Sequence, residues 1–168
     1  MRYPIIALII YLTVAAQTTL VDTIQIGRIG PDLPAMVAVA IALLHGGNGA
    51  LLIVAVIGLL EDALWPGRLG ISMAWYLILT WALLAGRERF DLQSLSRRVT
   101  VTGLFACLLA LGIGTTRLAV GEPTIGFPAI AAHAAGIGLY TATVAVPFWL
   151  ALTWCENAVR HRLARYEI

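Results

Sequence analysis

The sequence has few charged residues and no lysine, since all 11 of its basic residues are arginine. Charged residues make up 12% of the 168 residues and hydrophobic residues 60%, whereas ordinary globular domains hold about 25% and about 45–50%. This composition excludes a water-soluble globular domain. We therefore expect one integral membrane domain that covers residues 1–168.

Motifs for metal, nucleotide and disulfide chemistry are also lacking. The two cysteines, Cys107 and Cys155, lie on different apolar segments, which does not indicate a secreted disulfide framework. The three histidines fall at different depths, and no HExxH or CxxC spacing marks a metal site. Since a phosphate-binding loop and a dinucleotide glycine fingerprint are missing too, we expect no cofactor and no nucleic-acid partner.

Apolar runs separated by short polar breaks predict an all-α, polytopic membrane protein with six transmembrane helices. The second helix would be only about 20 Å long at about 1.5 Å per residue, against a hydrocarbon core of about 30 Å. We therefore expect the glycine-rich joint 45–49 to lie in the headgroups, or the bilayer to be thinner there. The expected helices cover residues 4–21, 32–44, 49–64, 69–85, 99–118 and 128–155, and a basic tail covers residues 156–168.

The arginines gather on one side of this expected bundle, which the positive-inside rule places in the cytoplasm together with both termini. The basic loop 86–98 is expected to lie along anionic headgroups of the inner leaflet. The N-terminal segment could instead be a cleavable signal peptide, but its apolar run continues to Val21, and we expect it to be retained. The inner side carries Arg2, Arg87, Arg89, Arg97, Arg98, Arg160, Arg162 and Arg165, and the outer side Arg28, Arg68 and Arg117.

Polar side chains stand at several expected helix ends. Asp32 can cap the second helix, with Pro34 in its first turn, and Gln17 should face another helix, because an amide in hydrocarbon needs a partner. Glu61 and Asp62 end the third helix, and a carboxylate at mid-bilayer costs at least about 3 kcal/mol. The pair should lie at the outer boundary or face the bundle. Because neighbours point about 100° apart, we expect at most one to face inward easily, with interfacial pairing to Arg68 or capping contacts as the alternative.

Small residues recur along the fifth and sixth expected helices. Such stripes let helix backbones approach closely, and we expect these two helices to pack within the bundle, with docking of a partner helix as the alternative. Pro147 is expected to kink the sixth helix, and Trp149 and Trp154 to mark the inner interface. The stripes are formed by Gly103, Ala106, Ala110 and Gly114, and by Ala132, Ala134, Gly136 and Gly138.

Ser72 in Gly-Ile-Ser-Met and His133 in Ala-His-Ala-Ala-Gly resemble the Ser-His dyad of rhomboid intramembrane proteases, which place a serine on helix four and a histidine on helix six. In that alternative, His133 would accept the proton of Ser72, and Ser72 would attack a peptide carbonyl. The chain departs from that family at Met73, where the family has glycine. The outer-loop Trp-Arg pair and the His and Asn oxyanion donors of helix two have no matching positions.

Residues 31–76 resemble the rod shape-determining protein MreD family, a family of small six-helix membrane proteins. The motifs appear in the family's order and at its spacing, and the length, topology and basic tail of the chain are similar as well. The chain departs from the family at Glu61. The matching positions are Gln17, Pro31, Asp32 and Leu33, Gly46 to Gly49, Gly58 to Leu60 with Asp62, and Leu69 with Gly70.

This resemblance implies a non-enzymatic scaffold of the bacterial elongation machinery in the cytoplasmic (inner) membrane, which regulates cell shape and peptidoglycan synthesis. Expected partners are an MreC-like bitopic protein, a RodA-type polymerase, a class B penicillin-binding protein and, indirectly, MreB. The candidate structural or partner-contact residues are Gln17, Pro31, Asp32, Leu33, Gly46, Gly58, Asp62, Gly70, His133 and Gly136.

The MreD family is also similar in fold to the S-components of energy-coupling-factor transporters, so a substrate-binding transporter subunit is a further alternative. Those subunits often dock through an Ala-x-x-x-Ala pattern on helix one. Here the positions are Ala7, Tyr11 and Ala15, so Tyr11 obstructs that face.

Overall fold

The computed structural model describes residues 11–13, 15–19, 25, 29–64, 68–87, 94–122 and 126–163, the last eight of them as backbone only. Its elements are the helices α3 (Leu33–Leu44), α4 (Gly47–Leu64), α5 (Ile71–Gly86), α6 (Leu95–Ala119) and α7 (Phe127–Leu163). Residues 11–13 and 15–19 of the expected first helix are helical, and the rest of that helix lies outside the described residues. The all-α class predicted from the sequence is confirmed.

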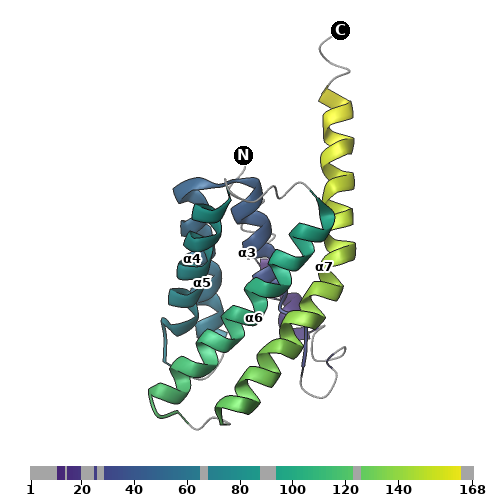
Figure 1. The fold of residues 1–168 in the computed structure, drawn as a ribbon. Helices are drawn as coiled ribbons and strands as arrows, with labels where there is room; N and C mark the ends of the chain where they lie inside the picture. Colours follow the sequence, from purple (N-terminus) through teal and green to yellow (C-terminus); the bar gives the residue numbers. More distant parts are fainter. Residues whose placement is uncertain are drawn as a thin grey trace.

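Consecutive helices from α3 to α7 run in alternating directions along the bundle (Figure 1). Within the described part of the chain, three helices are long and apolar enough to cross a membrane: α4, α6 and the segment Phe127–Cys155 of α7. The apolar helices α3 and α5 are shorter, with 12 and 16 residues. The C-terminal part of α7 extends beyond the ends of the other helices (Figure 1).

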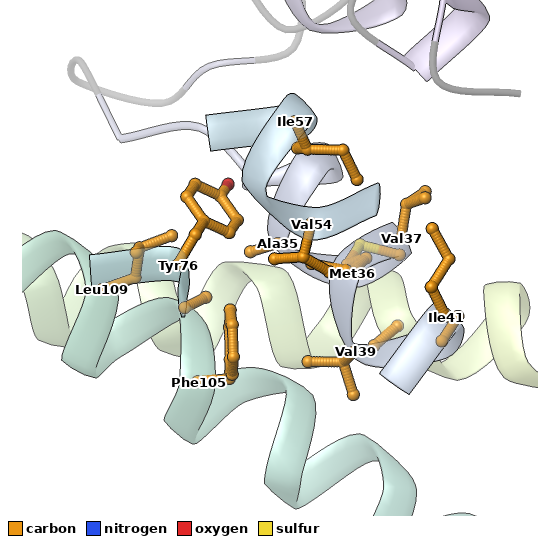
Figure 2. Packing of buried hydrophobic residues seen from close by; sticks show 14 of the residues in the cluster. Ala35, Met36, Val37, Val39, Ile41, Val54, Ile57, Tyr76, Phe105 and Leu109 are labelled. Atoms are coloured by element: carbon orange, nitrogen blue, oxygen red, sulfur yellow. The ribbon is translucent and has the colours of Figure 1, made fainter. Parts of the chain in front are cut away.

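Helix α3 lies at the centre of the bundle, where it packs against α4, α5, α6 and α7. Every residue from Pro34 to Ala42 is buried, as expected for a helix that is apolar around its whole circumference. Figure 2 shows the side chains of α3 surrounded by Val54 and Ile57 of α4, Tyr76 of α5 and Phe105 of α6. The four surrounding helices therefore share one core, and α3 fills it.

The start of α3 is the one predicted from the sequence. Asp32 caps the helix, because its Oδ1 accepts a hydrogen bond of 2.8 Å from the backbone N–H of Ala35, and Pro34 lies in the first turn. The joint to α4 is shorter than expected. It consists of His45 and Gly46, since α4 already begins at Gly47 rather than at residue 49.

Helices α6 and α7 pack closely through their small residues. A Cβ atom added to Gly103 would lie 2.8 Å from the Cβ of Ala142, and one added to Gly138 would lie 2.6 Å from the Cβ of Cys107. The expectation that the stripes serve packing within the bundle is confirmed. Both helices are longer than expected: α6 begins at Leu95 instead of residue 99, and α7 continues through Pro147 to Leu163 instead of ending at residue 155.

Trp149 of α7 does not face the headgroups, as a residue that marks the membrane interface would, because its side chain is fully buried. Its indole N–H donates a 3.0 Å hydrogen bond to Oγ1 of Thr102, and the guanidinium of Arg98 lies 5.1 Å from the ring centroid. A tryptophan can be buried when its N–H finds a partner, and Thr102 on α6 supplies it. Trp154, in contrast, is 75% exposed.

Candidate functional site

Asp62, in the last turn of α4, caps the beginning of α5. Its Oδ2 accepts hydrogen bonds from the backbone N–H groups of Gly70 (2.8 Å) and Met73 (3.2 Å), and its Oδ1 accepts one from Ser72 (3.0 Å). The residue is only 4% exposed. The first N–H groups of a helix have no partner within the helix and carry a partial positive charge, so a carboxylate is stabilised there. The capping alternative considered for the acidic pair is therefore confirmed for Asp62.

Gly58, one turn before Asp62, allows α4 and α5 to come close enough for this contact. A Cβ atom added to Gly58 would lie 2.6 Å from the Cα of Met73 and 3.2 Å from Cδ2 of Tyr76. No side chain fits at this distance from a backbone atom. Gly58 and Asp62, which belong to the same motif in the sequence, thus both contribute to the contact between α4 and α5.

The beginning of α3 is fixed by side chains from two other helices. The N–H of Leu33 donates to Oε1 of Gln17 at 3.0 Å, and the N–H of Asp32 donates to Oγ1 of Thr141 on α7 at 3.0 Å. Gln17 faces another helix, as predicted, and its partner is a backbone group. Thr141 is fully buried, and a single threonine in an apolar segment gave no signal of this role.

Glu61 lies close to Asp32 at the beginning of α3 and to Tyr76 of α5. The Tyr76 hydroxyl faces the carboxyl groups of both Glu61 and Asp32, and Tyr76 is fully buried. Neither this hydroxyl nor Oε2 of Glu61 has a hydrogen-bond partner of good geometry among the described residues. We call the group Gln17, Asp32, Glu61, Asp62, Tyr76 and Thr141 the polar junction.

The expectation that at most one of Glu61 and Asp62 faces inward is wrong. Asp62 reaches the first N–H groups of α5, whereas Glu61 approaches Asp32 and Tyr76. Two neighbouring side chains that point about 100° apart can both be buried when each faces a different partner helix. Here α3 and α5 both pack against α4. The cation near Glu61 is Arg117, whose Nε lies 3.8 Å from Oε2 of Glu122.

Replacing Thr141 with valine should destabilise the protein, because the N–H of Asp32 would lose its acceptor. A lost hydrogen bond with a polar group left unpaired costs about 1–3 kcal/mol. We expect a lower midpoint when the purified protein is heated in detergent and its folded fraction is followed by size-exclusion chromatography. Thr143→Val is the matched control, since that exposed hydroxyl donates to the carbonyl of Leu139 in its own helix. Equal midpoints for the two variants would contradict the role of Thr141.

The remaining candidates lie outside the polar junction itself. Pro31 is fully buried just before it, and Gly136 packs on Ile29, whose Cδ1 would lie 2.7 Å from an added Cβ. Gly46 lies at the other end of α3, against the guanidinium of Arg87. His133 is half-buried on α7, and no hydrogen bond within the described part of the chain joins it to Ser72.

The polar junction therefore supplies hydrogen-bond acceptors to the backbone N–H groups at the beginnings of α3 and α5. Its hydrogen bonds run mainly from backbone N–H groups to side-chain oxygens, which fixes the positions of α3 and α5. Over the described ranges, no group of three histidine, cysteine, aspartate or glutamate side chains is arranged to hold a metal ion. No protein-family model, curated protein or solved structure matches the chain.

Proposed function

We propose that this chain is a non-enzymatic scaffold subunit of the MreD type, which supports cell elongation in a bacterial cytoplasmic membrane. The observation that carries the proposal is spatial: residues from separate motifs of the resemblance meet in one place. Gln17 binds the N–H of Leu33, and Asp62 binds the N–H of Gly70. Residues of separate motifs thus bind one another, as is expected of residues that define a fold.

The proposal includes six membrane crossings, both termini in the cytoplasm and a fold similar to that of S-components. The alternating directions of α3 to α7 support it (Figure 1), because these five helices and the expected first helix would make six crossings, and an even number of crossings returns the chain to the side on which it began. Three glycines of the stripes, Gly103, Gly114 and Gly138, pack between α6 and α7, and Gly136 packs on Ile29. The MreC-like partner would therefore dock on other lipid-facing surfaces of the bundle.

The contacts of Ser72 favour a scaffold over a protease. Its backbone N–H binds Oδ1 of Asp62 at 3.0 Å, and its hydroxyl also lies within hydrogen-bonding reach of that carboxylate. A hydroxyl held by a capping carboxylate is placed for structure rather than for attack on a substrate. The transporter alternative gains no support from Tyr11, which is 69% exposed on the helix face where those subunits have small residues.

Affinity purification of the tagged, full-length protein from native membranes in mild detergent, followed by mass spectrometry, tests the proposal. We expect an MreC-like protein together with a polymerase and a transpeptidase, and none of these with an unrelated tagged membrane protein. Recovery of paired ATPases with a large membrane coupling subunit would instead identify a transporter component. If no partner is recovered and a fluorophosphonate labels Ser72, the scaffold proposal is wrong.

A further inference from the structure

A cavity of about 520 Å³ opens at the end of the bundle opposite the polar junction. It lies between the first turns of α4, which supply Gly47, Asn48 and Leu51, and the last turns of α5. Its position at the ends of two neighbouring helices places it at the boundary of the membrane. On the orientation predicted by the positive-inside rule, this boundary is the cytoplasmic one.

The wall of this cavity is divided into a polar and an apolar part. Arg87, just after the end of α5, and the amide of Asn48 provide hydrogen-bond donors at one side. Leu51, Trp81 and Leu84 line the part that continues along the two helices, and Trp81 is 65% exposed. A site with a cationic rim and an apolar wall suits an amphiphile with an anionic head.

The turn between α3 and α4 shapes the cationic rim. Gly46 has a backbone φ of +63°, a conformation in which glycine carries no steric cost. A Cβ atom at this position would collide with the terminal nitrogen of Arg87. The guanidinium thus lies across the turn at Gly46. Among the described residues, no carboxylate forms an ion pair with it.

We propose that this cavity binds the phosphate group of an anionic phospholipid, with an acyl chain along Leu51, Trp81 and Leu84. The planar guanidinium of Arg87 matches a phosphate through paired hydrogen bonds, and the amide of Asn48 adds a further donor. The lipid is anionic because zwitterionic headgroups carry their own cation, which offsets the charge that Arg87 recognises. Anionic lipids are concentrated at the basic side of membrane proteins, where Arg97 and Arg98 also lie.

Native mass spectrometry of the full-length protein tests this site, with phosphatidylglycerol and phosphatidylcholine of identical acyl chains as probes. We expect retention of phosphatidylglycerol, and binding about tenfold weaker in Arg87→Gln, as for the loss of one charge-assisted contact. Asn48→Ala should weaken binding less. Arg68→Gln is the matched control, because Arg68 is an exposed arginine at the opposite end of the bundle, and it should bind the lipid as the wild type does.

Equal retention of the two lipids, or unchanged binding in both Arg87→Gln and Asn48→Ala, would overturn the proposal. An excess of inorganic phosphate separates the two sources of the phosphate group. If it displaces phosphatidylglycerol completely, the cavity is a site for soluble phosphate and not for a lipid. The lipid measurement is independent of partner proteins, so its failure would leave the scaffold function untouched, and the reverse is also true.

Discussion

Asp62→Leu should lower the free energy of unfolding by at least about 3 kcal/mol, since three backbone N–H groups would lose their acceptor in a buried place and each such loss costs about 1–3 kcal/mol. The purified protein should show a broad, aggregated profile in size-exclusion chromatography, or a strongly reduced midpoint on heating. Assembly with partner proteins should fall in parallel, because α5 would no longer be fixed against α4.

Two further variants separate the parts of this contact. Asp62→Asn keeps one acceptor oxygen and loses the charge, so its midpoint should lie between those of the wild type and Asp62→Leu. Ser72→Ala removes the hydroxyl but keeps the backbone N–H that Asp62 binds, so we expect a small effect. If Asp62→Leu gives the wild-type midpoint and the wild-type yield of assembled complex, the cap contributes nothing.

Gly58→Ala should be the second most damaging change, although alanine is ordinarily a better helix former than glycine by about 1 kcal/mol. The new methyl group would meet the Cα of Met73 at 2.6 Å. A backbone atom cannot relieve this clash by a change of rotamer, as a side chain can. Separation of α4 from α5 would strain the hydrogen bonds of Asp62. We expect a loss of about 1–3 kcal/mol, as for other overpacked cores, measured by thermal unfolding in detergent.

Gly49→Ala is the control for this prediction, because it makes the same change in the same helix. A Cβ atom at Gly49 has no neighbour within 4 Å, so this variant should be as stable as the wild type or slightly more stable. The difference between the two variants isolates the contact with α5 from helix propensity. Equal midpoints would mean that the two helices can separate without cost.

Local patterns predicted the start of α3 well, because the residues that determine it are adjacent. Asp32 caps the helix and Pro34, two positions later, lies in its first turn, and both roles are confirmed. The inward direction of Gln17 was also predictable from the cost of an amide in hydrocarbon. Its partner was not, since the N–H of Leu33 belongs to a backbone group that no sequence pattern marks.

The rest of the polar junction depends on helix packing, which a single sequence does not contain. The inward position of Glu61 follows from α3 and α5 both packing against α4, and the burial of Trp149 follows from the position of Thr102 on a different helix. Helix ends were misplaced for a related reason. The arginines near the start of α6 suggested a loop along the headgroups, although the helix already begins at Leu95.

The central position of α3 has a consequence for the order in which the protein is made. The helix is synthesised early, yet one of the groups that fix it, Thr141, lies 109 residues after Asp32. Its neighbours α6 and α7 emerge from the ribosome after it, so the nascent chain holds α3 without its final surroundings until α7 has been made. A truncation that removes α7 would therefore expose α3, the central helix of the bundle, rather than a helix at its periphery.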